Sequence, residues 1–431
     1  MSTWLPDYVY VDGRFQSDRA VVCGSDGKIV EITEAAPDAI RLKGRAMLPG
    51  MVNAHSHAFQ RVIRGRTEHR SQHTTDSFWT WREQMYAAAN TLEPDEIYNV
   101  SRLAFLEMAL TGITAIGEFH YIHHSPDGSP YSDPNLLERQ VIRAARDVGV
   151  RIALLRVAYA RAGYQTEPNP QQIRFIEDSP DLYLKNLEQL LDINDDMAWI
   201  GVAPHSVRAA PLEYLKTIVA FANEHELPVH MHVAEQPAEV SACIAEYGRS
   251  PVALLETEGL LSKRFTAVHA IHVTPKAIAA LARNGAFVCA CPTTERNLGD
   301  GVVPVDAYFD AGVRVSLGTD SQIQIDLLED AREIEYHLRL QKMTRNVLAP
   351  MLAERLFDCA TINGAASIGF EGGRIAPGAP ADFFTVDLND LSIAGASVDD
   401  LLTNIVFSLA RTAVRDVVVG GKRIVEDGNH R

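Results

Sequence analysis

The sequence predicts an α/β protein in which a (β/α)8 barrel of the TIM type carries a small β-sandwich domain built from both chain ends. Short apolar runs alternate with helical patterns through the middle of the chain, and eight such units make a barrel of this type. Both ends instead hold short strand-like pieces separated by Asp-Gly turns. With 46% hydrophobic and 22% charged residues, the composition supplies a large buried core.

The barrel strands are expected where apolar and β-branched residues run without a break, because parallel strands are buried on both faces. Such runs lie at 49–56, 113–120, 150–158, 198–204, 227–234, 264–270, 286–291 and 313–319. Helical patterns lie between them at 92–110, 134–148, 212–225 and 275–284. An open doubly wound sheet is the alternative, but nothing in the chain resembles a glycine-rich dinucleotide or phosphate loop.

Two domains follow from this order: residues 1–48 with 372–431 form the β-domain, and residues 49–371 form the barrel. The strand-like pieces of the β-domain lie at 8–11, 28–32, 381–387 and 416–425. Within the barrel, the connection 58–90 is unusually long, which predicts an extra helix capping the barrel or a lid carrying Arg82 over the site. In this connection Trp79 and Trp81 alternate as in a packed strand or loop anchor.

The chain is acidic, with 40 Lys and Arg against 56 Asp and Glu and a net charge of −16. This balance disfavours nucleic acid and anionic membranes as partners, and a small anionic substrate needs a local patch of positive charge. No apolar run approaches the roughly 20 residues that span a bilayer, and the first residues lack a secretory signal. The five cysteines form no C-x-x-C pair. We expect a cytoplasmic homodimer.

Side chains that can bind metals stand at the C-terminal ends of five predicted strands, where barrel enzymes place their active sites. Residues i and i+2 of a strand point the same way, so His55 and His57 can both face the barrel interior. The other strand ends contribute His205, His232 with Glu235, His269, and Asp320. An H-x-H pair alone is a weak signal, but the gathering of these residue types at one barrel end predicts an active site.

Three imidazoles and one carboxylate form a ligand set suited to zinc or another borderline divalent ion. A catalytic ion of this kind keeps one position for water and lowers the pKa of that water to about 7. Glu235 lies three residues beyond His232 at the strand mouth, where it can carry protons without being a ligand. His269 can orient the water or polarise the substrate.

Together, His55-Ser56-His57, the stretch from His232 to Glu235, His269 and Asp320 resemble the amidohydrolase superfamily, in its deaminase-like branch. The β-domain from both termini, including the stretch 377–382, is similar to that superfamily as well. The resemblance implies one divalent ion per chain, most often Zn²⁺, held by His55, His57, His232 and Asp320. It also implies that Glu235, His269 and Asp320 are the catalytic residues.

Narrower motifs at 53–61, 76–83, 117–124, 205–209 and 295–301 are similar to the formimidoylglutamate deiminases, a family within this superfamily. This resemblance implies hydrolysis of N-formimino-L-glutamate to N-formyl-L-glutamate and ammonia in histidine degradation. It implies that the substrate is bound by Gln60, Arg82, Tyr121, His205 and Arg208. One stretch departs from the pattern: Gln322 replaces an expected histidine, which bears on fine specificity more than on the chemistry.

Two other functions remain open. A nucleobase or nucleoside aminohydrolase of the same branch shares the ligand set but favours aromatic stacking in the pocket over several arginines. A non-catalytic barrel would have lost ligands or the proton-transfer pair, and neither is missing. Of the remaining histidines, His230 is expected in the core. The group of His120, His123 and His124 either forms a second metal site or takes solvated or supporting roles in a loop.

Overall fold

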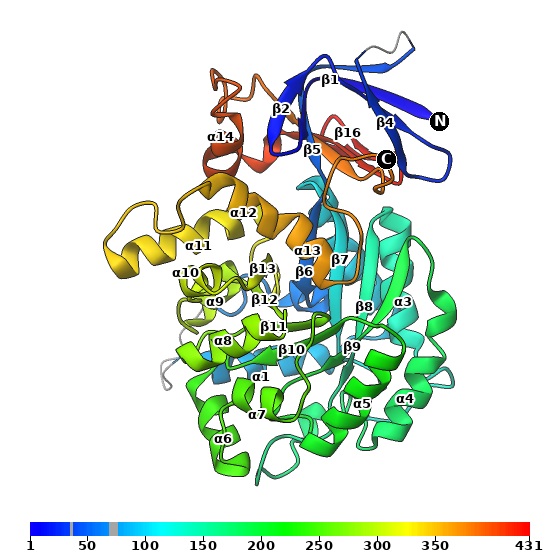
Figure 1. Cartoon of the computed structure of the whole chain (residues 1–431). Helices are drawn as coiled ribbons and strands as arrows, with labels where there is room; N and C mark the ends of the chain where they lie inside the picture. Colours follow the sequence, from blue (N-terminus) through cyan, green and yellow to red (C-terminus); the bar gives the residue numbers. More distant parts are fainter. Residues whose placement is uncertain (35–37, 69–75) are drawn as a thin grey trace.

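The computed structural model describes residues 1–34, 38–68 and 76–431, and it contains a parallel eight-stranded barrel (Figure 1). Each strand pairs with the next along the chain, which confirms the predicted (β/α)8 order. The strands are β6 (Met51–Ser56), β7 (Ile113–His120), β8 (Arg151–Ala158), β9 (Ala198–Pro204), β10 (Val229–Val233), β11 (Phe265–His269), β12 (Phe287–Ala290) and β13 (Arg314–Leu317).

The barrel closes at the C-terminal ends of its first and last strands. The His57 backbone N–H donates to the Asp320 carbonyl at 3.0 Å, and the Asp320 N–H donates to the His55 carbonyl at 3.0 Å. These two bonds join residues that follow β13 to the end of β6. The backbone bonds that close the barrel therefore also bring three of the expected metal ligands together.

Helices surround the barrel, and their sequences explain their bounds. In α3 (Leu136–Val148), the buried residues Leu137, Val141, Ala144 and Val148 recur every three to four positions, so one face packs on the sheet. The helix ends at Gly149, whose φ of +88° is the left-handed conformation that glycine adopts readily. Other helices are α2 (Pro94–Leu110), α4 (Pro180–Glu188), α5 (Leu212–Glu224), α6 (Pro237–Tyr247), α7 (Pro251–Thr257), α8 (Pro275–Arg283), α9 (Pro292–Leu298), α10 (Val305–Asp310), α11 (Leu327–Lys342), α12 (Leu352–Ala360) and α13 (Ile362–Ser367).

The long connection after β6 folds into a short 3-10 helix (Ala58–Ile63) and helix α1 (Phe78–Ala89); residues 69–75 of it lie outside the described residues. The expectation of an extra helix is therefore confirmed. The prediction that Trp79 and Trp81 lie in a packed strand or loop anchor was wrong, because both residues lie in α1. Ser77 and Thr80 cap the start of α1 reciprocally, and the Ser77 N–H lies 2.9 Å from Thr80 Oγ1.

The two chain ends share one mixed sheet of nine strands, drawn in blue and in orange to red in Figure 1. At its centre, β5 pairs with β1 in parallel and with β14 antiparallel. Trp4, Val21, Ile29 and Phe383 belong to a small core of its own. The elements are β1 (Ser2–Val11), β2 (Arg14–Ser17), β3 (Ala20–Cys23), β4 (Ile29–Thr33), β5 (Ile40–Pro49), β14 (Phe383–Asp387), β15 (Val414–Val419), β16 (Lys422–Glu426) and β17 (Asn429–His430), with helix α14 (Leu401–Ser408).

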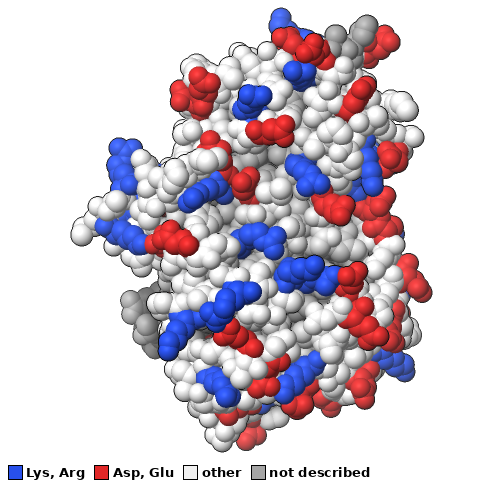
Figure 2. Space-filling model, viewed as in Figure 1, with Lys and Arg blue, Asp and Glu red and all other residues white. Residues whose placement is uncertain are grey.

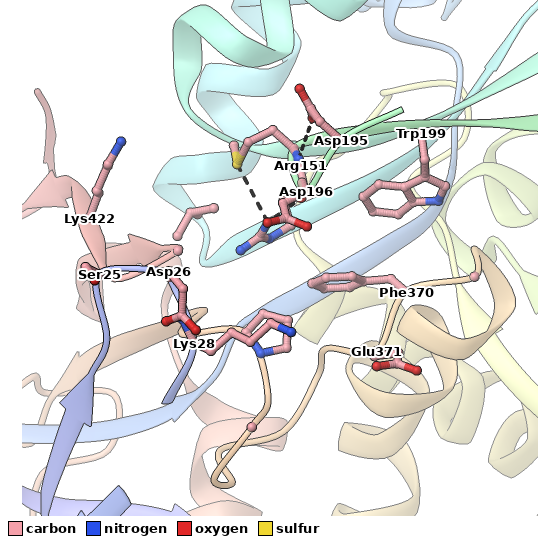
Figure 3. A pocket seen from close by; sticks show the side chains of 17 residues that line it. Ser25, Asp26, Lys28, Arg151, Asp195, Asp196, Trp199, Phe370, Glu371 and Lys422 are labelled. Atoms are coloured by element: carbon pink, nitrogen blue, oxygen red, sulfur yellow. Dashed lines mark hydrogen bonds between the residues drawn. The ribbon is translucent and has the colours of Figure 1, made fainter. Parts of the chain in front are cut away.

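A buried ion pair ties this sheet to the barrel. Arg151, at the start of β8, donates two hydrogen bonds to the Asp382 carboxylate, from Nε to Oδ2 at 2.7 Å and from Nη2 to Oδ1 at 2.9 Å. Beside it is a cavity of about 480 Å³, in which Arg151, Trp199 and Phe370 lie close together (Figure 3). The cavity opens at the N-terminal ends of β8 and β9, so it lies at the end of the barrel opposite the expected site.

Acidic and basic side chains are interspersed on the face shown in Figure 2. Among the described residues, no helix combines the length and the apolar character that crossing a membrane requires.

Candidate active site

The four expected metal ligands meet at the C-terminal mouth of the barrel. One ligand atom from each of His55, His57, His232 and Asp320 can be chosen so that all lie within 4.8 Å of one another, and all four residues are buried. His55 lies on β6, His57 directly follows that strand, and His232 lies on β10. Asp320 lies three residues beyond the end of β13. This is the donor set that a divalent transition-metal ion requires.

Hydrogen bonds to backbone carbonyls orient the imidazole rings of His57 and His232. His57 Nδ1 lies 2.8 Å from the Phe119 carbonyl, and His232 Nδ1 lies 3.1 Å from the His205 carbonyl. A carbonyl only accepts, so both rings carry their proton on Nδ1 and keep Nε2 as a lone-pair donor. Both nitrogens of His55 are buried without a hydrogen-bond partner. A bound cation would supply that missing partner, so the residues fit a metal ion.

The protonation states of the four side chains also suit a metal. Burial lowers the pKa of His55 to about 3 and lowers the pKa values of His57 and His232, so these rings are neutral at pH 7. Burial acts to raise the pKa of Asp320, but the neighbouring histidines, with His55 Nε2 3.5 Å from Asp320 Oδ1, hold it well below its usual range. The site therefore offers neutral imidazoles and one carboxylate, the forms that bind a cation.

Glu235 and His269 lie next to this group. His269 Nε2 is 3.8 Å from Glu235 Oε1 and 3.8 Å from Asp320 Oδ2. Burial raises the pKa of Glu235 to about 7. Burial acts to lower the pKa of His269, but the Glu235 carboxylate and the hydrogen bond that His269 donates to Glu295 raise it well above its usual value. A carboxyl group that titrates near neutral pH can both accept and donate a proton.

The backbone is strained at these same positions. Ala234, His269 and Asp320 have φ values of +52°, +66° and +49°. The left-handed region is costly for residues other than glycine, and such residues cluster at functional sites.

All five expected substrate-binding residues line one cavity together with the metal and proton-transfer groups. They are Gln60, Arg82, Tyr121, His205 and Arg208. Helix α1 forms one wall of this cavity through Phe78, Trp81, Arg82, Met85 and Tyr86.

The two arginines are placed differently from most arginines of the chain. Arg208 donates from Nη1 to Tyr159 Oη and to the Ala162 carbonyl, each at 3.2 Å. Arg82 stacks 4.5 Å above the Trp79 ring, and its buried Nε has no hydrogen-bond partner in the described ranges. Among described residues, no carboxylate lies within 4.0 Å of either guanidinium, whose charge therefore remains available to an anionic ligand.

Two other polar residues of the cavity wall, Gln60 and His205, have hydrogen-bond partners for only some of their polar atoms. Gln60 Nε2 donates to Tyr121 Oη at 2.9 Å, but Gln60 Oε1 is buried without a partner. His205 Nδ1 lies 3.2 Å from Ser206 Oγ. A buried acceptor without a partner is costly, so Gln60 Oε1 offers a second point of attachment for a ligand N–H.

Gln322 does not line this cavity. It is fully buried behind the metal group, where Nε2 donates to Ser56 Oγ at 2.8 Å and to the Asp320 carbonyl at 2.9 Å. Gln322 therefore supports the metal group from behind, and this departure from the pattern leaves the cavity wall unchanged.

The other histidines fall into two groups. His230 is buried in the core, as expected, with Nε2 2.8 Å from the Ser367 carbonyl. The solvated role expected for the second group was wrong for His120 and His123, which are buried. Both ring nitrogens of His123 already have partners, Glu138 at 2.7 Å and the Val157 carbonyl at 2.9 Å.

Sequence reasoning missed several residues of the cavity wall, notably Tyr159, Tyr86 and Leu298. Tyr159 directly follows β8, so the rule that located the other strand-end residues also applies to it. Tyr86 lies on α1, where no local pattern distinguishes it from core residues. Leu298, at the end of α9, belongs to the motif 295–301, but the motif does not show which of its side chains face the cavity.

Comparisons with known proteins agree with this geometry. Residues 46–424 match the model of the amidohydrolase family. The formimidoylglutamate deiminase of Pseudomonas aeruginosa is 40% identical over 413 residues, 94% of this chain and 90% of that protein. A 5-methylthioadenosine/S-adenosylhomocysteine deaminase of Halobacterium salinarum is 28% identical over 98% of this chain and 90% of its own length. The crystal structure of an amidohydrolase from Brucella melitensis superposes with a TM-score of 0.92 and 34% identity, covering 100% of this chain and 96% of that one.

The chain therefore belongs to the amidohydrolase family. It is a metal-dependent hydrolase that acts on C–N bonds, and the predicted superfamily is confirmed.

Proposed function

We propose that this enzyme is a zinc-dependent deiminase that hydrolyses N-formimino-L-glutamate to N-formyl-L-glutamate and ammonia. The observation that carries the proposal is the pair Arg82 and Arg208, two guanidinium groups on the wall of the metal cavity that have no carboxylate partner among the described residues. An acidic protein needs such local positive charge to hold a substrate with two carboxylates. The 40% identity to a formimidoylglutamate deiminase supports the same substrate.

One zinc ion per chain would be held by His55, His57, His232 and Asp320. When bound, such an ion lowers the pKa of a coordinated water toward neutrality and polarises the formimino group. The borderline imidazole and carboxylate donors favour zinc over the harder ions magnesium and calcium.

Side chains of the protein position the attacking water and transfer its protons. Asp320 and His269 hold the attacking water, whose oxygen forms a bond to the formimino carbon. Glu235 accepts a proton from that water and delivers it to the imino nitrogen, since its pKa near 7 permits both steps. The bond from carbon to this nitrogen then breaks, and ammonia leaves with the second proton of the water.

Arg82 and Arg208 would bind the two carboxylates of the glutamate part by charged hydrogen bonds. Gln60 Oε1 would accept from the substrate N–H, and Tyr121 and His205 would close the cavity around the chain of the substrate. These roles place the formimino carbon at the metal group and the acidic end toward α1.

A screen of ammonia release by the zinc-loaded enzyme tests the proposal, with N-formimino-L-glutamate, adenosine and guanine as substrates. Turnover of formimino-glutamate with kcat/KM at least 100-fold above the two others is expected.

A second candidate, a nucleoside or nucleobase aminohydrolase, is favoured by the tyrosines Tyr86, Tyr121 and Tyr159 that line the cavity. Preference for adenosine or guanine would establish that candidate instead.

We also propose that the enzyme is cytoplasmic and forms a homodimer. Leu340, Met343 and Met351 are 80%, 91% and 66% exposed around the end of α11, which projects from the body of the molecule in Figure 1. Large apolar side chains gathered on a surface are typical of interfaces. Light scattering should give twice the chain mass of 47.5 kDa, and Met343→Asp with Leu340→Asp should return the chain mass.

A further inference from the structure

A buried carboxylate stands directly behind His269, on the side away from the metal group. Glu295 Oε1 lies 3.1 Å from His269 Nδ1, and each residue is only 1% exposed. Glu295 belongs to α9, while His269 ends β11. It does not line the substrate cavity.

The backbone holds this carboxylate in place. The Cys291 N–H, at the start of α9, donates to the same Glu295 oxygen at 2.9 Å. One oxygen atom therefore joins the imidazole of His269 to the first turn of α9. Because the backbone of that turn is fixed by the preceding strand β12, the position of the oxygen is fixed as well.

The contact determines how His269 meets the reacting groups. A carboxylate oxygen that already accepts from a backbone N–H presents only an acceptor to Nδ1, so Nδ1 carries a proton. Nε2 then faces Glu235 and Asp320, each at 3.8 Å. The left-handed φ of +66° at His269 shows that the backbone alone does not favour this placement.

We infer that Glu295 is a positioning residue for the hydrolysis: it holds the orientation of His269 and the proton on its Nδ1, and it acts on the reaction through His269. The inference rests on the proposed function, in which His269 holds the attacking water. Carboxylates that orient a catalytic imidazole in this way make large contributions to turnover without touching the substrate.

A second metal site is the rival explanation, because ligand atoms of His269, Cys291 and Glu295 lie within 4.8 Å of one another. Two observations disfavour it. The same oxygen of Glu295 already serves two hydrogen bonds. Burial raises the pKa of the Cys291 thiol well above its usual value, whereas metals bind the thiolate.

The test compares Glu295→Gln and Glu295→Ala in the zinc-loaded enzyme. Glutamine keeps an oxygen for Cys291 N–H and His269 Nδ1–H but loses the charge; alanine loses both. We expect kcat on formimino-glutamate to fall about 10-fold in the first variant and about 100-fold in the second. KM should stay within about twofold, and zinc content should stay at the wild-type value, because Glu295 touches neither substrate nor metal group.

Glu335→Gln is the matched control. Glu335 is a fully buried carboxylate that accepts from the backbone N–H groups of Val347 and Leu348 at 2.9 and 3.1 Å, outside the substrate cavity. Its loss should lower the melting temperature and leave kcat unchanged. If Glu295→Ala behaves like this control, or if KM and zinc content change as much as kcat, Glu295 has only a structural role.

A spectroscopic measurement separates this inference from the proposed function. In protein labelled with ¹⁵N-histidine, the ring signal of His269, assigned with His269→Asn, should show a proton on Nδ1 that Glu295→Ala removes or shifts. An unchanged signal overturns the inference even if the enzyme is active. An inactive wild type with the expected signal refutes the proposed substrate alone. A second zinc per chain that Cys291→Ala removes would establish the rival metal site.

Discussion

Replacing Arg208 with methionine removes one of the two guanidinium groups that face the substrate cavity and keeps most of the apolar stem. The side chain is anchored by Nη1 on Tyr159 Oη and the Ala162 carbonyl, each at 3.2 Å. Neighbouring tyrosines raise its pKa further above its usual value against the effect of burial, so the group is always charged. The anchored geometry leaves Nε and Nη2 to form two hydrogen bonds with a substrate carboxylate.

The expected loss follows from these two bonds. A hydrogen bond to a charged group contributes about 1.5–3 kcal/mol, and removing one side of a desolvated charge pair costs about 2–5 kcal/mol. A loss of about 3–4 kcal/mol corresponds to a fall in kcat/KM of about 10²–10³-fold. Zinc content should not change, because Arg208 is no part of the metal group.

Steady-state ammonia release over a range of formimino-glutamate concentrations measures this loss. Arg296→Met is the matched control: Arg296 lies on α9, pairs with Glu333 at 2.6 Å and does not line the cavity. Its kcat/KM should stay within about twofold of wild type. If Arg208→Met and Arg82→Met both keep wild-type kcat/KM on this substrate, the carboxylate-binding role is wrong and the aminohydrolase candidate gains support.

Three further results are expected. Glu235→Gln keeps the shape of the side chain but cannot carry a proton, so kcat should fall about 10²–10⁴-fold with zinc content unchanged by elemental analysis; full turnover would exclude Glu235 as the proton carrier. His57→Ala should weaken zinc binding by at least about 10–100-fold in a chelator titration, and retention of zinc would contradict its role as a ligand. Burial raises the pKa of Glu177, but Arg156 at 2.5 Å outweighs it and lowers that pKa to about 2. The ionised carboxylate therefore contributes about 3 kcal/mol of stability above pH 4.5, which is lost between about pH 4.5 and 2 in urea unfolding; a Glu177→Gln enzyme with the same acid dependence would refute this account.

Much of the barrel was predictable because its signals are local. A buried parallel strand requires an unbroken apolar run, and the run at 198–204 coincides with β9. The end of each run marks the barrel mouth, so His55, His232 and Asp320 could be assigned to one site before their contacts were known. Helix α1 was less predictable, because its sequence has no strong apolar stripe and Trp79 is 39% exposed.

By itself, the sequence determined the barrel order, the metal-binding residue types at the strand ends, and the family. These features depend on periodicity and on short motifs, which neighbouring residues encode. Only the tertiary structure decided that Arg82 and Arg208 have no carboxylate partner within the described part of the chain, that Gln322 lies behind the metal group, and that Glu295 contacts His269. Each of these depends on how a helix or loop packs against a strand distant in the chain, and such packing leaves no pattern in the local sequence.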